Sequence, residues 1–301
     1  MTQTSLPLRH ALLALAVVAV WGTNFVVIRI GLDDLPPLLF ATLRFTFALL
    51  PAVFFIRRPD APWRDLAAYG VMIGAGQFGL LYIAMKGDIS PGLASLVVQS
   101  QAFFTVALAM GLSGERVKPF QIAAFALAAA GVGLILWRSD GSATPLGLVL
   151  VLLAGLSWAG GNIVSRRNPT ANMLAFVVWA SLFSIPPLAV LSLVFEGWPA
   201  IAQGLAAADA ATWATVLWQS VGNTLFGYAV WGWLLSRYPA ATIAPMSLLV
   251  PVFGMAASAV WLGEALPAWK LAAAALVIAG LAVNVFWPGV RGRLRRVPPA
   301  A

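Results

Sequence analysis

Amide side chains stand inside long apolar segments of this chain, where no water is present to hydrogen-bond them. An unpaired amide in such surroundings costs several kcal/mol, so each must face either an interior cavity or another helix. Near the middle third of their segments lie Asn24, Gln77, Gln99, Gln101, Gln219 and Asn223. A ring of amides at one depth indicates a site for the polar groups of a small solute. Alternatively, each of these amides could form a hydrogen bond with a neighbouring helix rather than with a solute.

Aromatic rings share helical faces with several of these amides. Trp21 and Asn24 stand at i, i+3, and Trp158 and Asn162 repeat the pairing at i, i+4. Amides can bond an ammonium or a carboxylate while rings pack against an apolar body. We therefore predict a binding site for a solute with an apolar or aromatic body and a polar head. Its predicted residues are Trp21, Asn24, Phe78, Tyr82, Gln99, Gln101, Trp158, Asn162, Trp179, Gln219 and Asn223.

The composition predicts the elements that must position these residues. Hydrophobic residues make up 61% of the 301 residues, charged ones 9%, and the mean hydropathy is +0.91, which is typical of an all-α integral membrane protein. Hydropathy predicts ten membrane-spanning helices joined by short loops, the longest near 196–212. They cover Ala11–Ile30, Leu38–Ile56, Leu66–Met85, Gly92–Leu112, Phe120–Trp137, Leu146–Ser165, Met173–Phe195, Trp213–Leu235, Ala240–Leu262 and Trp269–Trp287.

Residue types exclude several kinds of chemistry. The chain has no cysteine and one histidine, His10, so thiol chemistry, disulfides and His/Cys metal sites are excluded and no cofactor is expected. The predicted spans offer no paired aspartates, Ser/His pair or zinc motif, so an intramembrane enzyme is not expected. The loops are too short for the output domain of a sensor.

The distribution of charge predicts the topology. Of the 18 basic residues, 13 fall in the loops and tails on the side of the N-terminus. The positive-inside rule then places both termini in the cytoplasm of a multi-pass protein of a bacterial inner membrane. The net charge of +8 is explained in this way, so no nucleic-acid partner is expected. The expected partners are the lipid bilayer and a small-molecule solute.

Arg44 lies inside the second predicted span. It could bind a carboxylate of the solute, or it could snorkel outward or pair with Asp33 or Asp34, and we favour the pairing. No acidic residue falls within any predicted span. Glu115 and Glu264 stand at span ends beside glycines, where a helix-capping or loop role is expected.

Internal similarity divides the chain into two halves, residues 1–140 and 141–301. The segment from Gly263-Glu264 to Trp287 repeats that from Gly114-Glu115 to Trp137, and Trp158-Ala-Gly-Gly-Asn162 repeats Trp21-Gly-Thr-Asn24. Because each half holds an odd number of spans, the two five-helix repeats are inverted relative to each other. Inverted repeats around a central pathway are typical of transporters, and two fused halves favour a monomer.

These repeated motifs and the span count resemble the EamA-type branch of the drug/metabolite transporter superfamily, over essentially the whole chain. Within it, the sequence is most similar to bacterial exporters of aromatic amino acids and of organic cations such as paraquat. The resemblance implies that spans 1 to 4 and 6 to 9 surround a central path and that spans 5 and 10 are peripheral. It also implies export of small metabolites across the inner membrane. We expect aromatic or large neutral amino acids to be exported by alternating access, either as uncoupled facilitated transport or coupled through a group that the sequence does not identify. The alternative is proton-coupled antiport of other metabolites or organic cations, which the absence of an acid within the spans disfavours.

Overall fold

A computed structural model describes residues 6–113, 118–138, 140–168 and 172–294, with no β-strand among them. The first half contains α1 (Leu8–Asp34), α2 (Pro37–Leu49), α3 (Ala52–Phe55), α4 (Trp63–Val71), η1 (Met72–Gly79), α5 (Leu80–Gly87), α6 (Pro91–Val97), η2 (Val98–Ser100), α7 (Gln101–Ser113) and α8 (Pro119–Arg138). The second contains α9 (Pro145–Arg166), α10 (Met173–Leu191), η3 (Ser192–Glu196), α11 (Gly197–Ala207), α12 (Ala210–Leu217), η4 (Trp218–Phe226), α13 (Gly227–Arg237), α14 (Ala240–Ile243), η5 (Ala244–Leu249), α15 (Val250–Leu262) and α16 (Ala268–Leu294).

Nine helices in the described part of the chain are long and apolar enough to cross a membrane. The eighth predicted span, Trp213–Leu235, is not among these nine, but it is also a continuous helix, built from α12, η4 and α13. Its low hydropathy comes from polar residues in η4, which are buried inside the bundle: Gln219, Ser220, Asn223 and Thr224. The predicted all-α membrane fold is confirmed.

The helix ends follow from local sequence. Thr144, Asn172 and Asp209 each accept a hydrogen bond from a backbone N–H in the first turn of α9, α10 and α12, over 3.0, 3.0 and 2.8 Å. The bond that Asp209 accepts from the backbone N–H of Thr212 is the main cause that lowers the pKa of this carboxyl. Gly197, at φ +77°, separates η3 from α11. The predicted loop near 196–212 therefore contains the helix α11, which the sequence did not predict.

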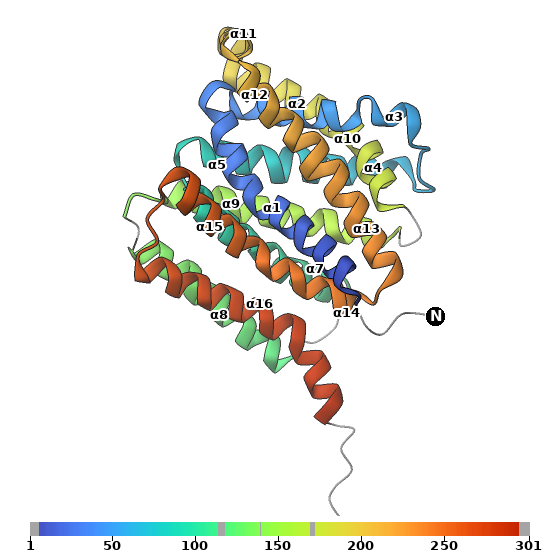
Figure 1. Ribbon diagram of the computed structural model, residues 1–301, viewed down its shortest axis with the longest axis vertical. Helices are drawn as coiled ribbons and strands as arrows, with labels where there is room; N and C mark the ends of the chain where they lie inside the picture. The colour runs from blue at the N-terminus through green and yellow to red at the C-terminus, as the bar shows by residue number, and fades with distance from the viewer. Residues whose placement is uncertain (1–5, 114–117, 139, 169–171, 295–301) are drawn as a thin grey trace, which may run out of the picture.

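The bundle has a compact part and a peripheral pair of helices. Helices α8 and α16 lie side by side along one edge of the bundle, as implied for spans 5 and 10 (Figure 1). In the compact part, α1 packs against α15, and α2 and α4 pack against α10. A Cβ on Gly22 of α1 would lie 2.5 Å from Cβ of Phe253 and 2.6 Å from the carbonyl oxygen of Val250, so glycine allows α1 and α15 to cross closely.

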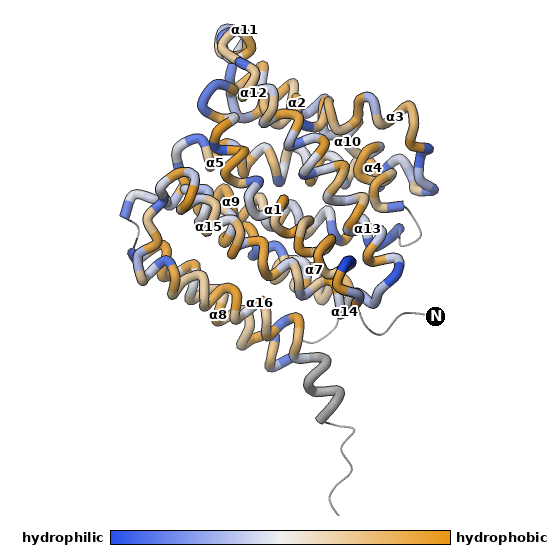
Figure 2. The backbone as a smooth tube through the Cα atoms, in the orientation of Figure 1, coloured by the Kyte–Doolittle hydropathy of each residue, from blue (hydrophilic) through white to orange (hydrophobic). Residues whose placement is uncertain are grey.

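The two ends of the bundle differ in charge. Helix α1 begins and α16 ends at one end, here called the terminal face, and the other end is the opposite face (Figure 1). Apolar residues dominate the helices, and hydrophilic residues gather where helices end (Figure 2). The helix ends and loops of the terminal face carry the basic residues Arg57, Arg58, Arg64, Lys118, Arg166, Arg167 and Arg237 beside the acids Asp60 and Asp65. Those of the opposite face carry the acidic residues Asp33, Asp34, Asp88, Asp140, Glu196, Asp209 and Glu264 beside the bases Arg29, Lys86, Arg138 and Lys270.

Candidate functional site

A central cavity of about 490 Å³ extends from the middle of the bundle to the terminal face. Its walls come from α1, from the third span (α4, η1, α5), from the fourth (η2, α7), from α9, from the start of α10, from the eighth (η4, α13), from the ninth (η5, α15) and from the terminal half of α16. The exposed Arg166 and the neighbouring Ser165 lie at its terminal end. The cavity is therefore open towards the face that carries the basic loops.

The structure brings most of the predicted site residues together in the wall of this cavity. They are Trp21, Asn24, Phe78, Gln99, Gln101, Trp158, Asn162 and Asn223. Trp21 and Asn24 share one face of α1, and Trp158 and Asn162 share one face of α9. The predicted alternation of amide and aromatic side chains is thus a property of the cavity wall.

Three predicted residues lie elsewhere. Trp179 donates a hydrogen bond from Nε1 to the carbonyl oxygen of Ile56 over 2.9 Å, and its ring packs edge-to-face on Trp63 at 6.0 Å. It points towards the end of the second span and the start of the third span rather than into the cavity. Tyr82 and Gln219 lie in a buried cluster beyond the closed end of the cavity, where Tyr82 Oη donates to Gln219 Oε1 over 2.9 Å.

Sequence reasoning missed part of the aromatic wall. Tyr69, Tyr228 and Trp231 line the cavity, and the ring of Trp21 lies 5.7 Å from that of Tyr228 and 5.1 Å from that of Trp231. The spacing of Tyr228 and Trp231 at i, i+3, one turn after Asn223, was a usable signal. The rings of Trp21, Tyr228 and Trp231 form an aromatic wall between α1 and α13.

Some of the amides in the wall join helices. Asn162 Nδ2 donates to Gln101 Oε1 over 2.9 Å and to Thr105 Oγ1 over 3.2 Å, which links α9 to α7. Trp21 Nε1 donates to the carbonyl oxygen of Asn223 over 3.1 Å, which links α1 to η4. The interhelical role weighed for the side-chain amides is therefore observed for Asn162 and Gln101, and it does not remove them from the cavity wall.

Other amides keep hydrogen-bonding capacity free. Oδ1 of Asn24 and Oε1 of Gln77 are buried and have no hydrogen-bond donor within the described part of the protein, although both residues line the cavity. Buried acceptors are rarely left unbonded, so these two atoms are suited to accept a bond from a solute or from water. Gln77 and Asn223 lie on η1 and η4, two π-helical segments in the third and eighth spans, and π-helical turns are frequent at functional sites.

The predicted pairing of Arg44 with Asp33 or Asp34 is wrong. Asp33 forms an ion pair with Arg29, and Asp34 accepts a hydrogen bond from the hydroxyl of Thr212. Helix α2 instead turns Arg44 into the bundle, where its exposed fraction is 1%. Its guanidinium donates to Tyr82 Oη over 3.2 Å, Gln219 Oε1 over 2.9 Å and Thr224 Oγ1 over 3.2 Å.

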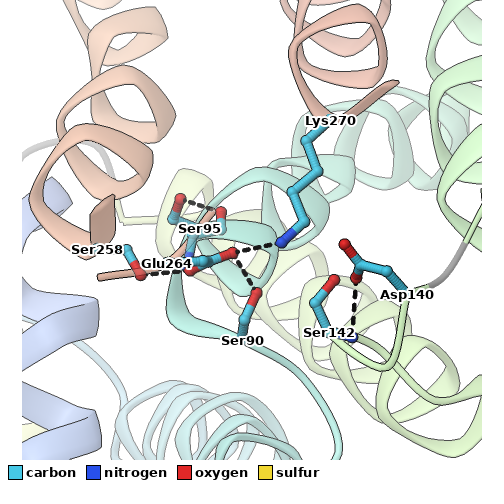
Figure 3. A network of polar contacts seen from close by, with 8 residues as sticks. Ser90, Ser95, Asp140, Ser142, Ser258, Glu264 and Lys270 are labelled. Atoms are coloured by element: carbon cyan, nitrogen blue, oxygen red, sulfur yellow. Dashed lines mark hydrogen bonds and ion pairs between the residues drawn. The ribbon is translucent and has the colours of Figure 1, made fainter. Parts of the chain in front are cut away.

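A network around Glu264 joins the two halves at the opposite face (Figure 3). The carboxylate of Glu264 accepts bonds from the backbone N–H of Gly92 over 3.0 Å and from Ser90 Oγ over 2.5 Å, both at the start of α6. It also accepts from the hydroxyl of Ser258 and lies 3.2 Å from Nζ of Lys270, which is 2% exposed. Glu264 thus has the expected capping role, on α6 of the other half. Glu115 lies outside the described residues.

A second carboxylate closes the opposite face near α2. Glu196 accepts bonds from the backbone N–H groups of Leu38 over 2.5 Å and Leu39 over 3.0 Å, in the first turn of α2. Like Glu264, it connects the second half of the chain to a helix start in the first half. The residues that line the cavity do not extend to this face, where Glu264 and Glu196 join the two halves.

A bundle of membrane-crossing helices around a polar and aromatic cavity with access from one face defines a membrane transport protein. The sequence identifies the family of this transport protein, because the sequence profile of the EamA-like transporter family matches residues 8–137 and again residues 145–286. The chain belongs to the EamA-like transporter family, as its resemblance implied, and is a transporter rather than an enzyme.

Individual relatives agree with this family. The chain is 44% identical over 293 residues to a probable amino-acid metabolite efflux pump of Salmonella typhimurium, covering 95% of this chain and 98% of that protein. It is 40% identical over 291 residues to a protein of the same description from Escherichia coli K12, covering 95% and 97%. A solved crystal structure with 19% identity superposes with a TM-score of 0.63 over 96% of this chain and 99% of the other, which supports the fold alone.

Proposed function

We propose that the protein exports amino acids with aromatic or large neutral side chains from the cytoplasm of a bacterial cell through the central cavity. The observation that carries this proposal is the wall chemistry: aromatic rings beside amides, with free acceptors at Asn24 and Gln77. The acceptors suit an ammonium group and the rings suit an apolar side chain. A volume of about 490 Å³ lies within the range of about 300–1,000 Å³ of small-molecule sites.

The relatives support the same class of solute. The two efflux pumps align along nearly their full lengths, and their descriptions name amino-acid metabolites. We extend this class to the present chain and narrow it to aromatic or large neutral side chains because of the wall formed by Trp21, Tyr228 and Trp231.

The proposed mechanism is alternating access between the halves 1–140 and 141–301, taken as inverted repeats. In the observed state, Glu264 and Gln219 of the second half bond residues of the first half on the closed side of the cavity. These contacts must break when the cavity opens to the opposite face. The basic loops favour a cytoplasmic terminal face, so the observed state is the one that loads solute from the cytoplasm.

We further propose that transport is not coupled to protons. Among the described residues that line the cavity, none is acidic. Asp65, placed before the third span by hydropathy, lies in the first turn of α4, is buried and accepts a bond from Asn168 Nδ2 over 2.9 Å. It is not part of the cavity wall, so it is not placed to exchange a proton with the solute pathway.

The test is uptake of labelled tryptophan, phenylalanine and threonine into liposomes that contain the purified protein, with no ion gradient imposed. We expect uptake down the amino-acid gradient, faster for tryptophan and phenylalanine, and an unchanged initial rate after a pH gradient is applied. Empty liposomes give the background rate. No protein-dependent uptake of any amino acid, with or without a pH gradient, would overturn the proposal.

A further inference from the structure

We infer that Arg44 recognises the carboxylate of the transported solute and thereby selects amino acids against organic cations. The inference rests on the proposed function and assigns a specificity-determining role to a residue outside the cavity wall. Three features of the structure carry it: a buried charge with no opposite charge beside it, unbonded donors next to that charge, and an aromatic ring, Phe78, that contacts the charge and lines the cavity.

Arg44 is a cation without a counter-charge. Its side chain is 1% exposed, and the groups that accept its hydrogen bonds, Tyr82 Oη, Gln219 Oε1 and Thr224 Oγ1, are all neutral. No carboxylate in the described ranges forms an ion pair with it. Arginine stays protonated in proteins, and an uncompensated charge at membrane depth is strongly unfavourable. A buried charge that carries this penalty is expected to meet an anion during the working cycle.

Two buried donors of this cluster remain unbonded. Nε of Arg44 and Nε2 of Gln219 have no acceptor within the described part of the chain. The two residues are in direct contact, because Nη1 of Arg44 donates to Oε1 of Gln219 over 2.9 Å. A carboxylate would supply a negative charge opposite Arg44 and two oxygens that can accept hydrogen bonds from these two donors.

Phe78 contacts both the cluster around Arg44 and the cavity. Cζ of Arg44 lies 3.6 Å from the centre of the Phe78 ring, in cation–π contact, and Phe78 itself lines the cavity. Rotation of this ring would expose the guanidinium to the closed end of the cavity, where the carboxylate of an amino acid could replace the ring as its partner. The ammonium group would then face the free acceptors of Asn24 and Gln77 on the cavity side.

The same arrangement disfavours organic cations. Arg166, at the terminal end, is the charged residue among the described residues of the cavity wall, so the deep part of the cavity experiences the positive charge of Arg44 without opposition. In a medium of low dielectric constant this charge repels a cation and attracts a carboxylate. Selection by charge is therefore expected in addition to selection by the aromatic wall.

The test compares tryptophan with trimethylated tryptamine, a permanent cation with the same ring, in liposomes containing the wild type, Arg44→Gln or Arg44→Lys. We expect the wild type to transport tryptophan at least tenfold faster than the cation. Arg44→Gln should bring this ratio close to one by slowing tryptophan, whereas Arg44→Lys should keep the preference. Arg29→Gln, which removes an arginine paired with Asp33 on the opposite face, should leave the ratio unchanged.

Binding of indole-3-propionate to the detergent-solubilised proteins separates this inference from the proposed function. We expect it to bind the wild type and to lose at least tenfold in affinity for Arg44→Gln. Such binding without any amino-acid transport would overturn the proposed function alone. Three results would overturn the role of Arg44. They are equal slowing of tryptophan and cation transport by Arg44→Gln, equal rates for both solutes in the wild type, and an affinity for indole-3-propionate that Arg44→Gln leaves unchanged.

Discussion

Asn162 of α9 donates a hydrogen bond to Gln101 of α7 over 2.9 Å, and both side chains line the central cavity. The bond connects the half 141–301 to the half 1–140. Under the proposed function, a solute that bonds either amide would compete with this bond between the halves. The pair would then link solute binding to the proposed rearrangement of the bundle.

The first prediction concerns this pair. Asn162→Leu removes the donor and leaves Gln101 Oε1 with the longer contact from Thr105 Oγ1 at 3.5 Å. Interhelical hydrogen bonds in membranes contribute about 0.6 to 2 kcal/mol, so we expect a destabilisation of roughly 1 kcal/mol, measured by thermal unfolding in detergent. The KM for tryptophan should also rise. Ser236→Ala removes a hydroxyl bonded within one helix on the exposed surface and should change neither quantity; an equal effect of both variants would contradict the prediction.

The second prediction concerns the network around Glu264. Glu264→Gln removes the charge opposite Lys270, whose side chain is 2% exposed. Removing one partner of a buried pair typically destabilises a protein by about 3–5 kcal/mol. We expect a clear fall in the unfolding temperature, partly restored in Glu264→Gln/Lys270→Met because no buried charge remains. A double variant less stable than the single one would show that the pair is not energetically linked.

The sequence predicted some features well because they depend on composition and period. Asn24 and Asn162 were identified because an amide amid apolar residues must find a polar neighbour, and both line the cavity. The face of a helix on which Trp179 lies could not be predicted from its depth in the span. The acceptors of Arg44 lie 38 to 180 residues away along the chain, on α5 and η4, so only the packed structure reveals them.

The third prediction tests the crossing of α1 and α15. Gly22→Ala places a Cβ 2.5 Å from that of Phe253, and overpacking of this kind costs about 1–3 kcal/mol. We expect a lower unfolding temperature. Gly133→Ala is the matched control, because a Cβ there meets no atom within 4 Å and alanine favours the helix, so stability should stay equal or rise. Equal unfolding temperatures for Gly22→Ala and Gly133→Ala would contradict the close crossing of α1 and α15.

The fourth prediction tests the orientation in the membrane. Because the chain has no cysteine, single cysteines can be introduced without a background signal. Asp140→Cys lies on the opposite face and Arg167→Cys on the terminal face, and both positions are exposed. In intact cells whose outer membrane has been removed, we expect an impermeant maleimide to label position 140 and to label position 167 only after lysis. The reverse pattern would place both termini outside.

The most direct measurement of the central claim is efflux of labelled tryptophan from preloaded liposomes containing the wild type, Trp158→Ala or Trp137→Ala. Trp158 lines the cavity, whereas Trp137 is 76% exposed at the end of α8. If amino acids pass through the cavity, Trp158→Ala slows efflux at least tenfold and Trp137→Ala leaves the wild-type rate. Equal rates for the wild type and Trp158→Ala, or equal slowing by both substitutions, would contradict a pathway through this cavity.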